Sequence, residues 1–340
     1  FLYLDSNGRA YKVGNISNSS SSSTSSPVAW VGNRFYTFIA ACSANAAGLN
    51  HSDGISYSWG DGWWGQIGNN TRAIAASSPI SAVGNHSFVK IFGCAANGNY
   101  YALKADGSLW SWGRNSSGQL GDNTIASRSS PVSVYGNHSF ISVAPGSDHM
   151  IALKSNGEVW GCGSNGWGQL GLNDTNNRST PVKIATHAFT AIAAGNTHSS
   201  ALKSDGTAWG WGYNGSGQIG DNTVVNRSSP VSVVGGKVFS KISCSYNTTN
   251  TLDTNGRLWA WGSNEYGQLG TNTAVTVHRS SPVSCVNTGS FIYISAGYYN
   301  CYAMKSTGEV WSFGRNDYGQ LGDGTRESRS SPVSMLGFPR

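Results

Sequence analysis

The chain has 340 residues, of which 45 are glycine, and charged residues make up 11% of it. Glycine is about twice as frequent, and charge less than half as frequent, as in ordinary globular domains, which argues against a coiled coil, a long helical bundle and an acidic disordered chain. The formal net charge of +6 is spread without a polybasic tract, and no stretch of about 18 apolar residues exists that could insert into a membrane as a helix.

The first residues predict a strand, a turn and a second strand. Residues 1–4 are apolar, and residues 5–14 (DSNGRAYKVG) place an Asn-Gly turn before a further strand-like segment. The serine run at 19–26 predicts a flexible polar loop or an O-glycosylated one. Because the chain opens on Phe1 without an initiator Met or a signal-like leader, we expect a processed chain or an excised fragment.

The chain repeats itself along nearly its whole length. A Ser/Thr-Pro-Val/Ile motif occurs seven times, and the tetrapeptide Gly-Gln-Leu/Ile-Gly begins at Gly65, Gly118, Gly168, Gly217, Gly267 and Gly319. Each unit contains four short segments, for example the apolar segments 139–144 and 150–154, the Trp-rich segment 209–212 and the Pro-Val segment 131–134. These segments are bounded by Gly, Asn, Asp or Ser, which is typical of strands joined by turns.

Four strands per unit, repeated seven times, predict an all-β fold: a seven-bladed β-propeller of four-stranded blades. The repeat units are placed at residues 1–32, 33–84, 85–136, 137–186, 187–235, 236–288 and 289–340 of a single domain. Only six apolar first segments occur, so either a strand that preceded residue 1 was removed or the unit at the chain ends is completed with three strands. In both cases one blade is expected to be formed by the two chain ends, with residues 1–30 beside residues 290–340. Such closure leaves few unpaired strand edges.

The pattern Trp-Gly-x-Asn-x-x-Gly-Gln-Leu-Gly, preceded by Ala-Leu-Lys-x-x-Gly and followed by Ser-Pro-Val, resembles the regulator-of-chromosome-condensation repeat. The resemblance covers nearly the whole chain and implies a seven-bladed propeller. Family activities include guanine-nucleotide exchange on a small GTPase, chromatin binding and inhibition of β-lactamase. The copies are unusually alike and lack an insertion to match the exchange factor's wedge, which favours a bacterial, phage or environmental surface member over the eukaryotic exchange factor.

Aromatic residues supply the candidate binding site. Nine of the thirteen tryptophans lie in Trp-x-Trp-Gly segments and are predicted to pack between blades. Trp64 and Trp167 stand just before Gly-Gln, where an aromatic residue is also expected to pack, and Trp63 stands where other units carry Ser, Gly, Glu or Asp. Since an exposed Trp suits sugar or protein binding, Trp63, Trp64 and Trp167 are the candidate binding residues.

The remaining motifs have structural interpretations. Gly-Gln-Leu/Ile-Gly predicts a tight turn that needs positive φ, with Gln bonding to backbone. The repeated Arg that precedes Ser-Ser/Thr-Pro is expected to pair with Asp122, Asp221 and Asp323 within the loops. Lys and Arg are evenly distributed, so no nucleic-acid partner is expected. No catalytic motif and no metal-ligand spacing occurs, so we expect no catalytic residue, metal or cofactor.

Two further features concern the compartment. Cys42 and Cys94 occupy the same repeat position in adjacent units and are a candidate disulfide, with buried reduced thiols as the alternative. The sequon Asn-x-Ser/Thr marks candidate glycosylation sites at Asn15, Asn18, Asn50, Asn69, Asn85, Asn115, Asn137, Asn173, Asn177, Asn214, Asn226 and Asn247.

Three functional hypotheses follow. The first is a non-catalytic extracellular or virion-surface protein, such as a virion fibre, that presents loops to a protein, a glycan or identical subunits. The alternative is an intracellular interaction module, cytoplasmic or nuclear, that resembles the exchange factor for a small GTPase. The third is an enzyme with a site at the mouth of the central channel. Low charge and near-identical blades favour the first.

Overall fold

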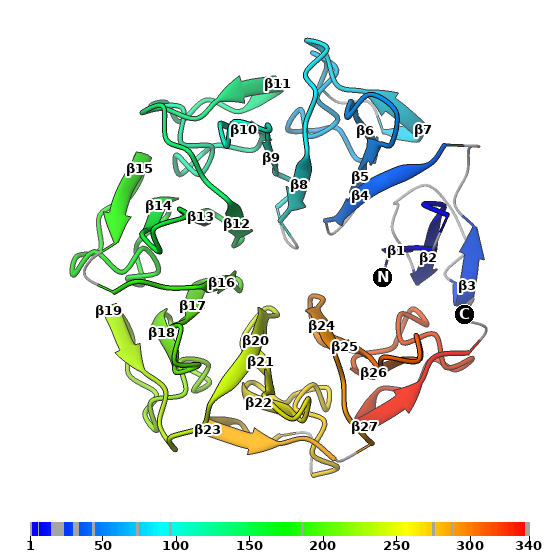
Figure 1. Cartoon of the computed structure of the whole chain (residues 1–340), viewed down its shortest axis with the longest axis vertical. Coiled ribbons are helices and arrows are strands. Elements are labelled where there is room, and N and C mark those ends of the chain that lie inside the picture. The colour runs from blue at the N-terminus through cyan, green and yellow to red at the C-terminus, as the bar shows by residue number, and fades with distance from the viewer. Residues whose placement is uncertain are drawn as a thin grey trace.

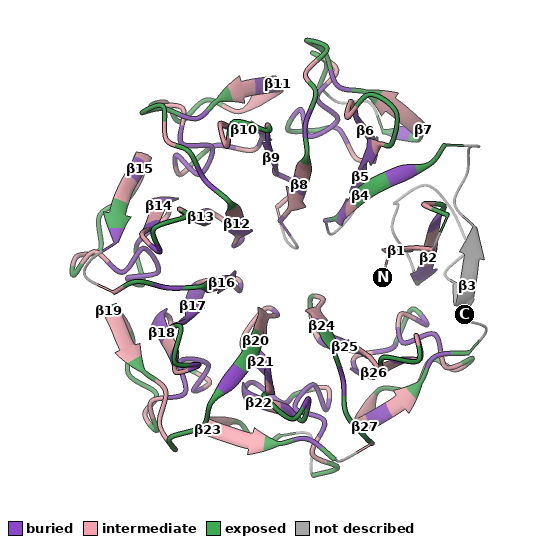
Figure 2. Cartoon of the chain, in the orientation of Figure 1, coloured by how far each residue is buried: buried purple, intermediate pink, exposed green. Residues whose placement is uncertain are grey.

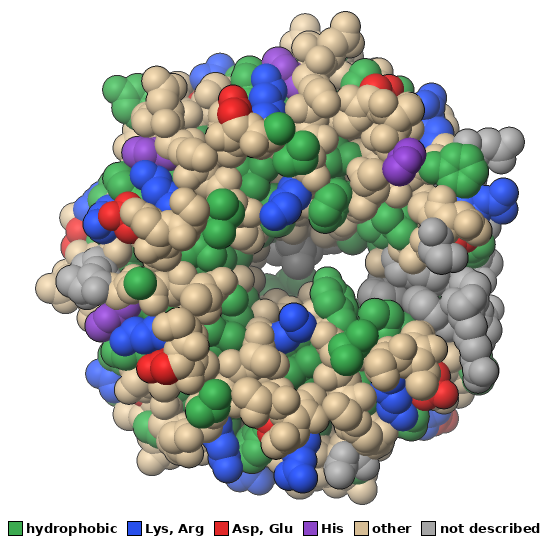
Figure 3. Space-filling view, viewed as in Figure 1, with side chains coloured by type: hydrophobic (Ala, Val, Ile, Leu, Met, Phe, Trp, Pro, Cys, Tyr) green, Lys and Arg blue, Asp and Glu red, His purple; other side chains and the backbone are tan. Residues whose placement is uncertain are grey.

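The computed structural model describes residues 2–5, 7–14, 24–29, 34–42, 45–72, 75–94, 97–184, 187–273, 276–286 and 288–336. In these ranges every regular element is a β-strand. The strands form six four-stranded antiparallel sheets and one three-stranded sheet, arranged as blades around a central opening (Figures 1 and 3).

The three-stranded sheet contains β1 (Leu2–Leu4), β2 (Ala10–Gly14) and β3 (Thr24–Ala29). The next three sheets contain β4 (Tyr36–Ala41), β5 (Asn45–Asn50), β6 (Ser56–Gly60) and β7 (Ala76–Ser81); β8 (Lys90–Gly93), β9 (Tyr100–Leu103), β10 (Leu109–Gly113) and β11 (Arg128–Ser133); and β12 (Ser142–Pro145), β13 (His149–Leu153), β14 (Val159–Gly163) and β15 (Arg178–Ile184). The last three contain β16 (Ala191–Ala194), β17 (His198–Leu202), β18 (Ala208–Gly212) and β19 (Arg227–Ser232); β20 (Phe239–Cys244), β21 (Thr248–Asp253), β22 (Leu258–Gly262) and β23 (Arg279–Ser284); and β24 (Tyr293–Ala296), β25 (Asn300–Met304), β26 (Val310–Gly314) and β27 (Arg329–Ser334). In each four-stranded blade the first strand borders the channel and the fourth lies at the rim (Figure 1).

The blade count corrects the sequence prediction. The structure has six four-stranded blades, so the prediction of seven such blades, one of them built from both chain ends, is wrong. The C-terminal strand β27 pairs with β26 and completes a blade of its own, while β1, β2 and β3 pair only with one another among the described strands. The N-terminal sheet therefore has three strands and borrows none from the C-terminus.

The chain ends nevertheless lie side by side, as predicted. Figure 1 places both termini in the same sector of the ring. Val13 of β2 is fully buried against Tyr302, Val310 and Met335 of the last blade. The N-terminal sheet thus closes the ring through side-chain packing instead of through a shared sheet.

Buried aromatic residues join neighbouring blades. The side chain of Trp112 in β10 is fully buried, packs against Ala47 and Leu49 of the preceding blade, and donates from Nε1 to the backbone oxygen of Gln66 at 3.1 Å. Trp211 and Trp261 donate in the same way to the backbone oxygens of Gln169 and Gln218 in the blade that precedes each of them. Burial is greatest in the second and third strands of each blade (Figure 2). The prediction of Trp packing between blades is therefore confirmed for the second Trp of each Trp-x-Trp pair.

The Gly-Gln-Leu/Ile-Gly turn also follows its prediction. Gly118 has a φ of +82°, and a Cβ there would lie 2.6 Å from the Cα of Ser179 in the next blade, so no larger residue fits. The Gln119 side chain accepts a hydrogen bond from the Ser117 backbone N–H at 2.9 Å. Asp122 pairs with Arg128 at 2.6 Å within the same loop, as predicted. These bonds make the loop between the third and fourth strands a rigid platform.

Candidate functional site

The disc has two chemically different faces. Because neighbouring strands are antiparallel, the loops that join the first to the second strand and the third to the fourth strand of each blade lie on one face. We call it the aromatic face, after the residues that its loops carry: Trp63, Trp64, Trp167, Tyr213, Tyr246, Tyr266, Tyr298, Tyr299 and Tyr318. The opposite face carries the remaining turns, and we call it the lysine face.

All three predicted binding residues lie on the aromatic face. The exposed fractions are 65% for Trp63, 50% for Trp64 and 49% for Trp167, which are high for such large apolar side chains. Trp63 and Trp64 lie between β6 and β7, and Trp167 lies between β14 and β15. They therefore occupy two different blades and do not form one compact cluster.

A repeated stack positions these rings. The aromatic residue before Gly-Gln packs against a residue of the next blade. That residue directly follows the Trp-x-Trp-Gly segment or the equivalent segment. The Trp64 ring lies 5.7 Å from the Arg114 guanidinium, and the rings of Trp167 and Tyr213 are 5.1 Å apart. In the intervening blades the same position holds Ser117 and Ser216. Aromatic stacks thus alternate with serines around this part of the ring.

The largest aromatic group, which we call the tyrosine patch, consists of Tyr246, Tyr266, Tyr298, Tyr299 and Tyr318. The ring centroids of Tyr298 lie 4.5 Å from those of both Tyr246 and Tyr299, and Tyr266 lies 5.0 Å from Tyr299. Such separations are contact distances for aromatic rings. The patch joins loops from two consecutive blades, β20–β23 and β24–β27.

Arg315 lies at the centre of the tyrosine patch. Its guanidinium is 5.1 Å from the Tyr266 ring, 5.8 Å from Tyr299 and 5.9 Å from Tyr318. Its Nε also pairs with the Asp317 carboxylate at 2.6 Å, and this hydrogen bond raises the pKa of Arg315. The guanidinium therefore stays charged, but its charge is balanced within the patch.

The hydroxyls of Tyr298 and Tyr299 remain protonated. Burial raises the pKa of Tyr298, and the neighbouring Tyr246 and Tyr299 act in the same direction. Burial likewise raises the pKa of Tyr299. Ionised tyrosine would be poorly solvated here, so both side chains keep their O–H groups as neutral hydrogen-bonding groups at physiological pH.

A chain of backbone hydrogen bonds fixes the loops around the channel mouth. The Ser147 N–H donates to the Asn196 oxygen at 3.2 Å, the Asn196 N–H to Tyr246 at 2.9 Å, and the Tyr246 N–H to Tyr298 at 3.0 Å. Each bond crosses from one blade to the next. The tyrosines nearest the channel are therefore held in place before any ligand binds.

The charges of the aromatic face balance. Its loops and the adjoining strand ends carry nine arginines, Arg72, Arg114, Arg128, Arg178, Arg227, Arg279, Arg315, Arg326 and Arg329. They also carry nine acids, Asp61, Asp122, Asp148, Asp174, Asp221, Glu265, Asp317, Asp323 and Glu327. Several pair locally, including Arg114 with Asp148 at 3.4 Å and Arg227 with Asp221 at 2.6 Å. This face therefore has little net field to attract a strongly charged ligand.

The lysine face is built differently. At Trp110, the Lys104 ammonium lies 4.4 Å from the ring and the His86 ring lies 4.1 Å from it. Equivalent stacks form at Trp160 and Trp209, and Lys237 and Lys305 cover Trp259 and Trp311. Figure 3 views one face of the disc, where blue basic side chains outnumber red acidic ones around the ring. The first Trp of each pair is partly buried: it packs against the core cluster between its blade and the preceding one and also lies beneath a lysine, so the expectation of packing between blades holds for it as well.

Two histidines cross the blade seams below the aromatic face. His149 Nε2 lies 3.0 Å from Ser199 Oγ, and His198 Nε2 lies 3.1 Å from Thr249 Oγ1 in the following blade. Both rings are fully buried, and among the described residues their Nδ1 atoms find no hydrogen-bond partner. Burial lowers the pKa of each histidine to about 3, so both are neutral at physiological pH.

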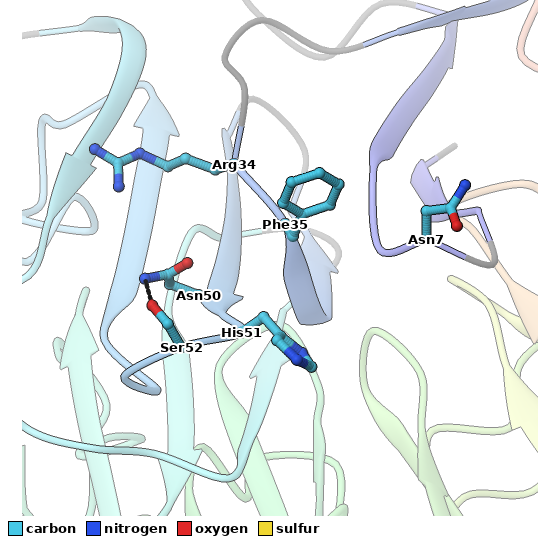
Figure 4. A pocket seen from close by; sticks show the side chains of 6 residues that line it. All are labelled: Asn7, Arg34, Phe35, Asn50, His51 and Ser52. Atoms are coloured by element: carbon cyan, nitrogen blue, oxygen red, sulfur yellow. Dashed lines mark hydrogen bonds between the residues drawn. The ribbon is translucent and has the colours of Figure 1, made fainter.

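A cleft of about 390 Å³ lies on the lysine face, next to the N-terminal sheet. It is lined by Asn7, Arg34, Phe35, Asn50, His51 and Ser52 (Figure 4). Figure 4 shows the Arg34 and His51 side chains extending away from each other. Because its polar groups do not converge on one point, we do not place the functional site in this cleft.

The predicted disulfide is not formed. Cys42 Sγ lies 3.8 Å from the backbone oxygen of Asn99, and Cys94 Sγ lies 3.6 Å from that of Ser147. None of the six cysteines, all of which lie in the described ranges, forms a disulfide bond. Burial raises the pKa of the Cys42 thiol well above its usual value, which keeps it protonated and unreactive.

Burial removes two of the predicted glycosylation sites. Asn115 is fully buried, and its Nδ2 donates to Asp122, Thr124 and Ala126; Asn214 is bound in the same way. A glycan would have to replace these bonds at Nδ2, so neither residue can carry one in the folded protein. Asn15 and Asn18 lie outside the described residues. The other candidates stay predictions: Asn50, Asn69, Asn85, Asn137, Asn173, Asn177, Asn226 and Asn247.

The described residues contain no group of three or more His, Cys, Asp or Glu side chains that could hold a metal ion. In the same ranges, no helix is long and apolar enough to cross a membrane.

Sequence reasoning missed the tyrosine patch. The signal was present, because Tyr246 and Tyr298 stand where two other units carry Ser147 and Asn196. Tyr299 likewise replaces the polar residues of its equivalents, Asp148 and Asn247. An aromatic residue at a repeat position where other units carry a small or polar residue departs from the repeat, and such departures could have indicated the patch.

Comparison with protein families gives a match described as "Regulator of chromosome condensation (RCC1) repeat" at residues 106–153, 156–202, 205–252, 255–304 and 307–340. A second form of the same repeat matches residues 140–169, 189–218, 239–268 and 291–320.

Solved structures share the fold. Human WBSCR16 is 20% identical with a TM-score of 0.83, and the match covers 100% of this chain and 94% of that one. Yeast RCC1 (Prp20) bound to Kap60 is 18% identical, with a TM-score of 0.83 and coverage of 98% and 85%. Prp20p from Saccharomyces cerevisiae, studied for its binding to Gsp1p and histones, is 20% identical, with a TM-score of 0.84 and coverage of 99% and 88%. These similar structures are of human and yeast proteins, so they do not support the expected bacterial or phage origin.

Proposed function

Because the chain belongs to the family of regulator of chromosome condensation (RCC1) repeat proteins, we propose that it is a non-catalytic protein-interaction module that binds its partner on the aromatic face. The observation that carries this proposal is the gathering of exposed Trp, Tyr and stacked Arg side chains on one face of the disc. These are the three residue types that dominate the binding energy of protein interfaces.

Preorganisation supports the same conclusion. Arg114 is held by Asp148 and Arg315 by Asp317, each beside an aromatic ring. Side chains that are already ordered lose less conformational entropy when a partner binds, and this improves affinity. Exposed aromatic side chains that are rigid in the free protein are therefore suited to act as anchors.

The comparisons favour a protein partner over a glycan or a second copy of the chain. The yeast relative binds Kap60 and has been studied for binding to Gsp1p and histones. We extend from it only the class of partner, a protein. Nothing in the comparisons supports the expected extracellular or virion-surface role, so we propose the intracellular alternative.

The test compares the two faces with variants taken from the chain's own repeats. Trp64→Ser with Trp167→Ser introduces the residue found at Ser117 and Ser216. Lys104→Asn with Lys154→Asn introduces the residue found at the equivalent Asn50. Each immobilised protein is exposed to an extract of the source organism, and retained proteins are quantified by mass spectrometry.

The expected result is a set of proteins retained by the wild type and by the lysine-face variant but lost from the aromatic-face variant. Equal retention by all three proteins, or loss from the lysine-face variant alone, would contradict the proposal. Thermal unfolding of each variant is the control for an intact fold.

A further inference from the structure

We propose that the tyrosine patch binds an extended proline-rich segment of the partner in the polyproline II conformation; this inference rests on the proposed function. Tyr246, Tyr298 and Tyr299 lie on loops beside the channel, whereas Tyr266 and Tyr318 lie on loops between the outer strands. The patch therefore runs from the channel mouth towards the rim. A strip of this shape suits an extended segment better than a compact epitope.

The chemistry of the patch matches such a segment. A polyproline II helix has no internal hydrogen bonds, so its carbonyl groups need external donors. Neutral tyrosine hydroxyls can donate such bonds. Flat aromatic rings pack well against proline rings, and proline-rich segments dock in aromatic-lined grooves in other proteins. The preformed polyproline II conformation also lowers the entropy cost of binding.

Other recognition modes fit the patch less well. An acidic or phosphorylated segment needs arginines with uncompensated charge, but Arg315 is paired with Asp317 at 2.6 Å. A methylated ammonium group needs a gap between rings, but Tyr298 lies at contact distance, 4.5 Å, from both Tyr246 and Tyr299. Addition of a β-strand needs an open sheet edge, whereas the patch is made of loops.

The balanced charge of the aromatic face points the same way. With nine arginines and nine acids in its loops and adjoining strand ends, the face offers no net attraction to a charged segment. Exposed fractions of 38% for Tyr298 and 50% for Tyr318 leave ring surface available at both ends of the strip. An uncharged segment with ring side chains is thus the best match.

The experiment uses blocked decaproline as the probe and measures its affinity for the full chain by calorimetric titration. Tyr298→Ala and Tyr318→Ala each remove one end of the strip. Tyr135→Ala is the matched control, because Tyr135 is 58% exposed and lies in a loop of the lysine face. Tyr298→Phe keeps the ring and removes only the hydroxyl. A blocked Gly-Ser decapeptide and a blocked glutamate-rich decapeptide control for extended but unrelated segments.

We expect decaproline to bind the wild type and Tyr135→Ala equally, and to bind Tyr298→Ala and Tyr318→Ala at least about tenfold more weakly. Tyr298→Phe should lose about threefold, since the ring contact remains. Absence of decaproline binding, equal binding of either control peptide, or unchanged affinity of Tyr298→Ala would overturn the inference. If the aromatic-face variant still loses its retained proteins in extract, only the segment chemistry is wrong and the proposed function stands.

Discussion

The two faces of the disc differ in how regularly they are built. On the lysine face a lysine covers a tryptophan in five blades, with nearly the same geometry each time. On the aromatic face one repeat position changes from Trp64 to Ser117, Trp167 and Ser216 in successive blades. A feature that every blade repeats belongs to the construction of a blade. A position that varies among near-identical blades is not required for the fold of a blade, so its side chain can contribute to binding.

The largest expected effect is a pH-dependent loss of stability caused by two histidines buried between blades. His149 and His198 stand where other blades carry Asn45, Asn99 and Asn300, and their pKa values of about 3 lie below that of an unfolded histidine. Between pH 6.5 and 3 the unfolded chain binds more protons, so the free energy of unfolding falls as the pH falls through this window. From pH 6.5 to 4 the loss should be roughly 3 kcal/mol for each histidine.

Chemical denaturation at pH 7 and pH 4 measures this loss. The double variant His149→Asn and His198→Asn should keep the fold, because asparagine fills the same position elsewhere in the ring, and should lose most of the pH dependence. An unchanged pH dependence in the double variant would show that other groups control acid stability.

The second prediction compares two tryptophans of one strand. Trp211→Ala removes a fully buried side chain at a blade seam and should lower the free energy of unfolding by about 3–5 kcal/mol. Trp209→Ala removes a half-buried ring beneath Lys203 and should cost about 1–2 kcal/mol. Urea denaturation of the two variants measures the difference. Similar losses would mean that the seam is no more important than the lysine-face stack.

The third prediction concerns the lysine stacks themselves. Lys154→Asn removes an ammonium 4.4 Å from the Trp160 ring and should lower the free energy of unfolding by about 0.5–1 kcal/mol. Lys154→Arg keeps the cation and should cost less. If the two variants are equally destabilised, the stack does not depend on the charge.

The smallest effect on stability is expected on the aromatic face. Trp167 is 49% exposed, so Trp167→Ser should change the free energy of unfolding by less than about 1 kcal/mol while weakening partner binding. Thermal unfolding and binding to the retained proteins are measured on the same sample. A large loss of stability would show that Trp167 mainly stabilises its blade, which contradicts the assignment of this residue to binding.

Features that the repeat itself imposes could be predicted from the sequence. The positive φ of Gly118 and the bond of Gln119 to backbone follow from a motif that recurs in six units. The paired Asp122 and Arg128 recur as well, so their partnership was visible before any coordinates. Local turns depend on local residues, and repetition reveals which residues a turn requires.

Features that depend on distant segments could not be predicted. The count of four-stranded blades depended on whether the N-terminal unit gains a fourth strand from elsewhere in the chain, which local sequence does not decide; among the described strands β1, β2 and β3 pair only with one another. The tyrosine patch unites Tyr246 with Tyr298 across about 50 residues. The sequon at Asn115 is a local sequence pattern and does not indicate whether the side chain is exposed. In the folded chain this side chain is buried and hydrogen-bonded to Asp122. The same repeat position for Cys42 and Cys94 did not ensure bonding geometry.

The most direct test of the central claim places a photo-activated cross-linker on each face in turn. Benzoylphenylalanine replaces Tyr318 on the aromatic face, 50% exposed, or Tyr135 on the lysine face, 58% exposed, so the two probes are equally accessible. Cross-linking in cells of the source organism should join a protein partner to position 318, and this product should disappear when Tyr299→Ala is added. Cross-links from position 135 alone, or from neither position, would contradict the account.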